Sequence, residues 1–125
     1  MRLLLDTHVF LWALAGSPLL TDSARRIIEA ADEVYVSAVS IWEIAIKAWL
    51  GRIDADAGEL AAAIEPSGFL ELPIRVEHAV GVAALELHHS DPFDRLLIAQ
   101  ALAEPLKLLT ADATLMRDSD LVVLA

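Results

Sequence analysis

The residues with the clearest chemical potential are four carboxylates that lie in otherwise apolar segments. They are Asp6, Glu43, Asp94 and Asp112. Moving an ionised carboxylate into apolar surroundings costs on the order of several kcal/mol unless a partner compensates its charge. The chain has 9 Lys and Arg residues against 19 Asp and Glu residues, so cationic side chains are too few to compensate every acid. We therefore expect a divalent cation to draw these four carboxylates together.

Three of the acids also have a purely structural interpretation. Asp6 and Asp112 each precede a predicted helix, and Asp94 lies near the front of another. Asp is a favourable helix N-cap because its carboxylate accepts hydrogen bonds from free backbone N–H groups. For each of these positions, capping and metal binding remain open as alternatives.

Glu43 is different because it lies inside a predicted helix and cannot cap it. Helical spacing places Val39, Ile46 and Leu50 on the same face, which is therefore expected to be buried. The structural alternative is an ion pair with Lys47, one helical turn further on. A buried Glu without a partner is rare.

The segment around Asp94 adds two candidate supporting residues. Asp94 shares a helix face with Leu97 and Ile98, so it points where a core is expected. Asp91 is predicted either to cap this helix or to act as an outer-shell ligand of the metal. Arg95 is predicted either to pair with Asp91 or to contact a phosphate.

The elements that position these acids are predicted from apolar runs and from Pro, Gly and capping residues. Strands are expected at residues 2–5, 33–36, 69–74, 106–110 and 121–124. Helices are expected at residues 7–15, 21–30, from Ser37 or Ser40 to Leu50, and at 57–65, 76–87, 91–104 and 112–116. This alternation predicts a three-layer α/β/α sandwich with a mostly parallel central sheet. Ligands bind beyond the carboxyl ends of such strands, where Asp6 and Asp112 fall.

Composition limits the function further. The 125 residues suit a single domain, 1–125, and the absence of Cys excludes disulfides and thiolate zinc sites. Asp6 and His8 interrupt the apolar N-terminal stretch, which argues against a signal peptide, and no apolar run reaches the length of a membrane span. We expect a cytoplasmic protein without a membrane partner. The hydrophobic fraction of 57% favours a further apolar interface, most simply in a homodimer.

The net charge of −10 opposes nucleic-acid binding, which usually needs a basic surface. A nuclease of this charge would depend on bound metal, on dimerisation and on clustered cations. The candidate phosphate contacts are Arg25, Arg26, Lys47, Arg52 and Arg95. Oxygen ligands without Cys favour Mg²⁺, with Mn²⁺ as a substitute, over zinc. Carboxylates that bind such a metal at a strand edge are typical of phosphodiester hydrolysis, in which the metal acidifies a water molecule and neutralises phosphate charge.

Several segments resemble the successive motifs of PIN-domain proteins, and within that family the VapC-type toxins of bacterial toxin–antitoxin pairs. The segments are Leu4–His8, Ser40–Lys47, His89–Ala101 and Leu109–Asp112, and their order extends over nearly the whole chain. The resemblance implies a Mg²⁺-dependent endoribonuclease that acts on RNA, leaves 5′-phosphate and 3′-hydroxyl ends, and is inhibited by a cognate antitoxin. It also implies that Asp6, Glu43, Asp94 and Asp112 form the catalytic metal site, with Thr7 and Thr110 as supporting hydroxyls.

Other functions remain as alternatives. A Mg²⁺-dependent phosphatase that phosphorylates a strand-end Asp typically has a second Asp two residues later, where this chain has His8. A receiver-like signalling module uses a Lys near its last strand, which the C-terminal segment lacks. A nuclease fold that retains only partner binding is a third alternative. His88 and His89 are predicted to be loop or helix-end residues, and Trp12 to line a groove for a partner.

Overall fold

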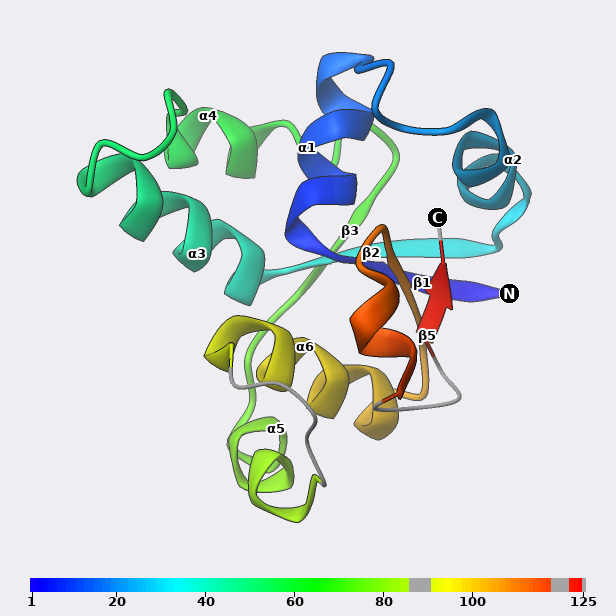
Figure 1. Ribbon diagram of the computed structural model, residues 1–125, viewed down its shortest axis with the longest axis vertical. Helices are drawn as coiled ribbons and strands as arrows, with labels where there is room; N and C mark the ends of the chain where they lie inside the picture. The colour runs from blue at the N-terminus through cyan, green and yellow to red at the C-terminus, as the bar shows by residue number, and fades with distance from the viewer. Residues whose placement is uncertain (86–90, 118–121, 125) are drawn as a thin grey trace.

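The computed structural model describes residues 1–85, 91–117 and 122–124. A parallel sheet of five strands lies at the centre, in the order β3-β2-β1-β4-β5. The strands are β1 (Arg2–Leu5), β2 (Glu33–Ser37), β3 (Leu70–Leu72), β4 (Lys107–Thr110) and β5 (Val122–Leu124). Figure 1 shows these strands crossing the middle of the molecule.

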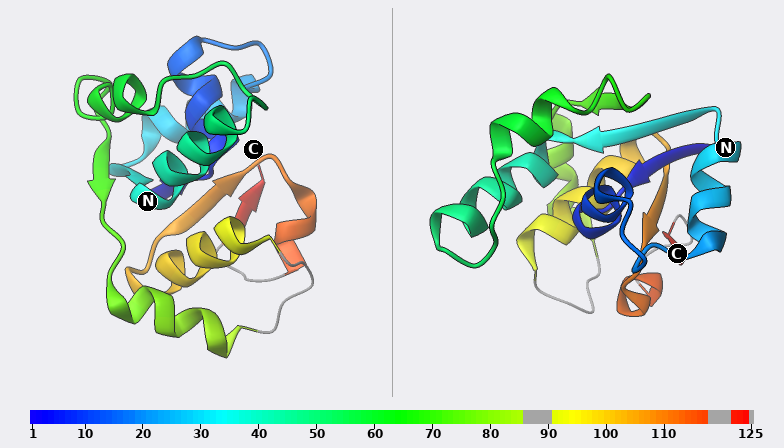
Figure 2. Two further views of the ribbon diagram at one scale, coloured as in Figure 1. Left: turned by 90° about the vertical axis from the view of Figure 1, so that its left-hand side faces the viewer. Right: turned by 90° about the horizontal axis from the view of Figure 1, so that it is seen from above.

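Helices cover both faces of the sheet. They are α1 (Thr7–Ala15), α2 (Asp22–Ala30), α3 (Ala38–Trp49), α4 (Ala57–Ala62), α5 (Val76–Gly81) and α6 (Pro92–Ala103), with 3₁₀ helices η1 (Val82–Ala84) and η2 (Ala113–Arg117). Figures 1 and 2 show α1, α2 and α4 on one side and α5 and α6 on the other. The three-layer α/β/α sandwich predicted from the sequence is therefore confirmed. No helix in the described part of the chain has both the length and the apolar character needed to cross a bilayer.

The side chains of β1 explain why its sequence is continuously apolar. Leu3 and Leu5 pack into the core cluster beneath α1 and α2, whereas Leu4 packs into the cluster beneath α6. Successive side chains of a strand point to opposite faces, so a strand covered on both sides needs apolar residues at every position. All three leucines are fully buried.

Local sequence signals set most helix boundaries. The Thr21 hydroxyl accepts a hydrogen bond from the Ala24 N–H and begins α2, and the Ser37 hydroxyl does the same for Val39 at the start of α3. Gly16, with a φ of 61°, ends α1 in the left-handed conformation that Gly adopts without steric cost. The predicted helix at 7–15 is confirmed with its limits unchanged.

Three predicted elements are shorter or looser in the structure. The strand expected at 69–74 is limited to Leu70–Leu72, because Pro73 has no N–H group to continue the ladder. The helix expected at 57–65 ends at Ala62. The helix expected at 76–87 ends at Gly81 and continues as a 3₁₀ turn. Residues 86 and 87, His88, His89 and residue 121 lie outside the described residues.

The strand order creates a switch point between β1 and β4. From β1 the chain continues to β2 and β3 on one side, and it later forms β4 and β5 on the other. Loops therefore leave β1 and β4 in opposite directions, which opens a crevice at their carboxyl ends. The Asp6 N–H donates to the Leu109 carbonyl at 3.0 Å, and this bond joins the two strands at that edge.

Candidate metal centre

Asp6 lies at the carboxyl end of β1 and is only 5% exposed. It is the N-cap of α1, since its Oδ1 accepts a hydrogen bond of 2.8 Å from the Val9 N–H. Its Oδ2 accepts a hydrogen bond from the Thr110 hydroxyl at the end of β4. Burial raises the pKa of Asp6, although the bonds from Thr110 and Val9 partly oppose this rise. Asp6 is therefore a cap and, at the same time, a carboxylate held at the switch point.

Glu43 lies on the buried face of α3 and is 4% exposed. The Thr7 hydroxyl donates to Glu43 Oε1 at 2.7 Å and also lies 2.9 Å from the Ser40 hydroxyl. Lys47 Nζ is 2.5 Å from Glu43 Oε2, so the ion pair considered from the sequence is present. One carboxylate oxygen thus bonds to a hydroxyl from α1, and the other to a cation on its own helix.

Asp94 is half-buried in the first turn of α6. Burial, together with the negative charges of Asp91, Glu43, Asp6 and Asp112, in that order, raises the pKa of Asp94 to about 7. Like charges raise the pKa of an acid in this way only when they lie close to it. The structure therefore brings all four predicted acids into one electrostatic environment, although they come from four separate segments.

The residues next to Asp94 have different roles. Asp91 is the N-cap of α6, because its Oδ1 accepts hydrogen bonds from the N–H groups of Phe93 at 2.8 Å and Asp94 at 3.2 Å. Within the described part of the chain, the Nε of Arg95 is buried without a hydrogen-bond partner. The sequence prediction of a capping role for Asp91 is confirmed.

Asp112 is the exposed member of the set. Its backbone N–H donates to the Thr110 hydroxyl at 3.0 Å, and that same hydroxyl donates to Asp6. Its Oδ1 accepts bonds from the N–H (2.9 Å) and the hydroxyl (2.7 Å) of Thr114 at the start of η2. Thr110 thus connects the two acids at the strand ends.

The four acids are a suitable donor set for a hard divalent cation. All are oxygen donors. Burial is the main cause of the raised pKa values of Asp6 and Asp94, and the charges of neighbouring acids add to it. Among the described residues, however, the trio whose ligand atoms all lie within 4.8 Å of one another is a different one, namely Glu77, His78 and Glu104. The metal at the four acids stays a prediction.

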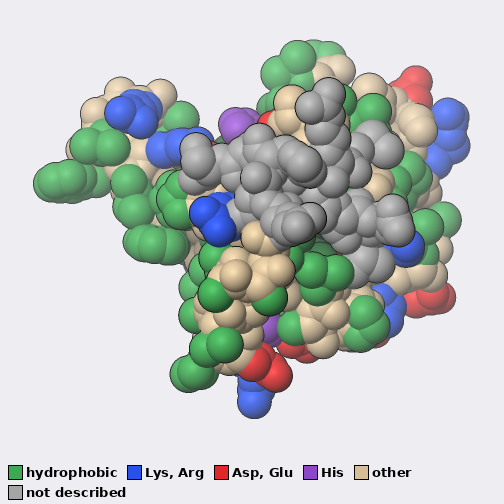
Figure 3. All heavy atoms as spheres, turned by 60° about the horizontal axis from the view of Figure 1, so that its bottom comes forward, with side chains coloured by type: hydrophobic (Ala, Val, Ile, Leu, Met, Phe, Trp, Pro, Cys, Tyr) green, Lys and Arg blue, Asp and Glu red, His purple; other side chains and the backbone are tan. Residues whose placement is uncertain are grey.

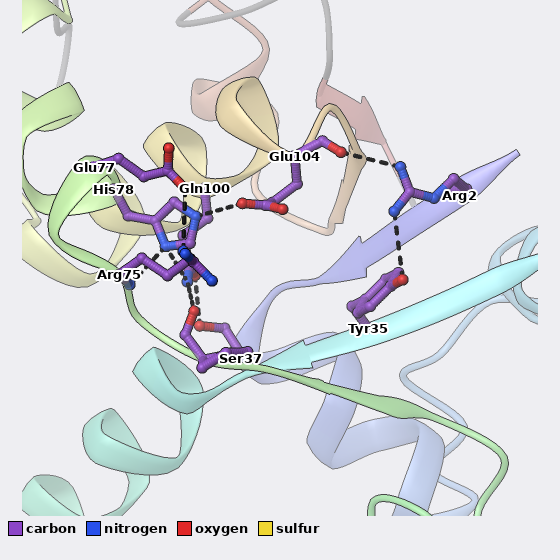
Figure 4. Close-up of polar contacts among 9 residues, drawn as sticks. Arg2, Tyr35, Ser37, Arg75, Glu77, His78, Gln100 and Glu104 are labelled. Atoms are coloured by element: carbon purple, nitrogen blue, oxygen red, sulfur yellow. Dashed lines mark hydrogen bonds and ion pairs between the residues drawn. The ribbon is translucent and has the colours of Figure 1, made fainter.

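Glu77, His78 and Glu104 are already engaged in hydrogen bonds and ion pairs within the protein. Figure 4 shows His78 at the centre of this network. His78 Nδ1 accepts a bond of 2.9 Å from the Arg75 N–H, so the proton is on Nε2, which lies 2.6 Å from Glu104. The Glu77 carboxylate pairs with Arg75. This network packs α5 against α6, and no ring nitrogen remains for a metal.

Sequence reasoning missed the polar residues that hold this part of the fold and one that supports the acids. Gln100 is fully buried and accepts a bond of 2.5 Å from the Ser37 hydroxyl. His78 is fully buried beside it. Ser40 was considered only as a helix start, although its hydroxyl contacts Thr7. A polar residue within an otherwise apolar helix face was the available signal for Gln100.

Comparisons of sequence point to one family. The model of the PIN domain family matches residues 3–118. Ribonuclease VapC22 of Mycobacterium tuberculosis is 33% identical, and the match covers 90% of this chain and 88% of that protein. The residues matched by the family model include all four acids.

Solved structures share the fold at low sequence identity. The crystal structure of VapBC2 from Rickettsia felis, bound to a DNA fragment from its promoter, contains a chain with a TM-score of 0.70 and 15% identity. That match covers 100% of this chain and 98% of the other. A toxin–antitoxin complex from Klebsiella pneumoniae gives a TM-score of 0.68 at 19% identity and covers 98% and 96% of the two chains. The arrangement of strands and helices is thus shared with chains of quite different sequence.

Proposed function

The chain belongs to the PIN domain family, and we propose on that basis that it is a Mg²⁺-dependent endoribonuclease toxin. The observation that carries the proposal is the convergence of four carboxylates near the switch point of the sheet, where burial, with the charges of Asp91 and the other three acids, raises the pKa of Asp94 to about 7. The similarity to a named ribonuclease, VapC22, supports RNA as the substrate.

In this proposal Asp6, Glu43, Asp94 and Asp112 hold the metal. Thr110 orients the Asp6 carboxylate, and Thr7 orients that of Glu43, through the hydrogen bonds described above. When bound, a divalent cation supplies Lewis-acid polarisation of the phosphodiester and makes a nearby water molecule more acidic. The residues of the chain then need only position carboxylates, which is consistent with a hydrolysis that forms no covalent enzyme intermediate.

The partner proposed for this chain is a cognate antitoxin that inhibits it. Two of the structures with the same fold are described as toxin–antitoxin or VapBC complexes. We further propose a homodimer in the cytoplasm. Figure 3 shows apolar side chains on the projecting part of the molecule. At the end of α3, Trp49 is 85% exposed and Leu50 is 49% exposed, so both are available for such an interface.

The sequence next to Asp6 disfavours the phosphatase alternative. Such an enzyme uses a second Asp two residues after the phosphorylated one, and this chain has His8 at that position. A receiver-like module uses a Lys near its last strand, and the C-terminal segment of this chain supplies none.

Metal removal tests the proposed function directly. We expect the purified chain to cleave single-stranded regions of total cellular RNA in Mg²⁺, to lose this activity in excess EDTA, and to regain it with Mn²⁺. End-labelling should detect 5′-phosphate on the products. Full activity in EDTA would contradict the proposal, and so would the absence of cleavage in both metals by antitoxin-free protein.

Lys47 provides a test of the metal that does not depend on activity. The Lys47→Met variant keeps the apolar part of the side chain but leaves the buried Glu43 carboxylate without its cation. We expect the metal-free variant to be less stable than the parent by about 1–2 kcal/mol. Mg²⁺ should raise its melting temperature more than that of the parent, because the metal then compensates Glu43.

The matched control for this experiment is Arg52→Met, which removes a cation at an exposed position beyond the end of α3. Its melting temperature and its response to Mg²⁺ should equal those of the parent. An equal Mg²⁺ response in all three proteins would show that Glu43 does not belong to the metal site.

A further inference from the structure

An open pocket of about 320 Å³ lies directly beside the acids. It is lined by Asp6, His8, Trp12, Ala111 and Asp112. Its lining therefore includes two of the proposed site acids and two aromatic rings from α1, His8 and Trp12, which are called the aromatic wall below. Ala111 contributes only a methyl group to the lining. The pocket thus combines the reaction site with a surface that has a different chemistry.

The aromatic wall is held in place by the fold. His8 and Trp12 are four residues apart on α1, so they lie on the same helix face. Their ring centroids are 6.0 Å apart, with an angle of 40° between the planes. Trp12 is half-buried and packs against the core cluster beneath α1, whereas His8 is exposed. One ring is thereby anchored and the other is available at the surface.

Charge favours a nucleobase as the occupant of this pocket. The chain carries a net charge of −10, and Lys47, a cation beside the acids, already pairs with Glu43. Stacking of a base on an aromatic ring contributes to RNA affinity without a positive charge. Proteins that bind single-stranded RNA stack its bases on Trp and His side chains. A nucleotide whose phosphate lies at Asp6 and Asp112 would have its base within reach of this wall.

We propose that Trp12 and His8 form a stacking site for one unpaired base next to the phosphate that is cleaved. This inference rests on the proposed ribonuclease function and adds to it a residue pair that binds the base of a flanking nucleotide. Trp12 and His8 bind substrate here and take no part in the chemistry. The site accounts for how so acidic a chain holds RNA close to its own carboxylates.

The experiment combines an RNA that lacks one base with a variant that lacks the Trp12 ring. A cleavage site is first mapped in total cellular RNA, and a short RNA spanning it is made with an abasic nucleotide at each flanking position in turn. We expect one abasic position to raise the KM of the parent about tenfold. Trp12→Ala should raise KM for the intact RNA by a similar factor, and the abasic substitution should then have no further effect on that variant.

Three variants serve as controls for this interpretation. Trp12→Phe keeps an aromatic ring and should retain most of the affinity, whereas Val76→Ala, at the exposed start of α5, should have the KM of the parent. If Trp12→Ala does not fold, His8→Ala at its exposed position should show a smaller rise in KM that again disappears with the same abasic RNA.

Two results would overturn the proposal. One is an abasic effect that is as large in Trp12→Ala and His8→Ala as in the parent. The other is unchanged RNA cleavage by both variants with weaker inhibition by an antitoxin protein, which would make the pocket a protein contact. A parent protein that does not cleave RNA would instead contradict the proposed function, and the two failures are therefore distinguishable.

Discussion

Replacing Asp6 with Asn is expected to lower the rate of RNA cleavage by about a thousandfold, which corresponds to roughly 4 kcal/mol of transition-state stabilisation. The substitution keeps the size of the side chain and one oxygen acceptor, but it removes a negative charge from the centre of the acid group. Single-turnover cleavage of a labelled RNA in saturating Mg²⁺ measures the effect.

The control for this prediction is Asp22→Asn, an identical chemical change at an exposed position in the first turn of α2. Both variants have the same net charge, so a general change in RNA attraction would affect them equally. We expect Asp22→Asn to cleave at the rate of the parent. Retention of more than a tenth of the activity by a folded, metal-responsive Asp6→Asn protein would remove Asp6 from the proposed site.

The second large effect is the pH dependence that Asp94 confers on the folding stability of the metal-free protein. Burial and the neighbouring acids raise the pKa of Asp94 from 3.8 to about 7 in the folded state. The folded protein therefore binds a proton between these pH values that the unfolded chain has released. This stabilisation is complete below the unfolded pKa and is lost as the pH rises through about 7.

Asp94→Asn should remove this dependence. In EDTA at pH 8 we expect the variant to be more stable than the parent by about 1–2 kcal/mol, after a reduction for solvent screening of a half-buried group. At pH 4 the two should be nearly equal, as chemical denaturation at both pH values would show. The variant should nevertheless have lost cleavage activity, which separates stability from function.

The affinity for Mg²⁺ should rise with pH, whereas the stability of the metal-free protein falls. A proton on Asp94 competes with a cation, so we expect Mg²⁺ affinity to fall by about tenfold for each pH unit below 7. Titration calorimetry with Mg²⁺ at pH 6 and pH 8 measures this change, with Asp22→Asn again as the control. Equal affinity at both values would mean that Asp94 does not bind the metal.

The sequence predicted the parts of the fold that depend on neighbouring residues. The limits of α1 follow from Asp6 and Gly16, and the parallel sheet follows from apolar runs separated by helices. One wrong boundary has a single-residue cause, since Pro73 ends β3 earlier than predicted. Caps, turns and buried faces are local properties, and a sequence states them directly.

The sequence was less informative about contacts between distant segments. The bond from Thr7 to Glu43 joins residues that are 36 positions apart, and the bond from Ser37 to Gln100 joins residues 63 apart. Such pairs depend on how helices are placed over the sheet, and composition does not encode that placement. A structural role does not separate Asp6 and Glu43 from the other acids. Asp6 caps α1 and Glu43 pairs with Lys47, yet both contribute to the negative charge around Asp94.

The hydrogen bond between Thr110 and Asp6 joins residues 104 positions apart and has a consequence for synthesis of the protein. A growing chain displays its first acid almost at once, but β4 leaves the ribosome only near the end of translation. Until then Asp6 lacks its hydroxyl donor and its neighbour Asp112. In the ribonuclease proposed above, an unfinished polypeptide therefore has only part of the acid group, and RNA cleavage begins only after β4 and Asp112 have been made.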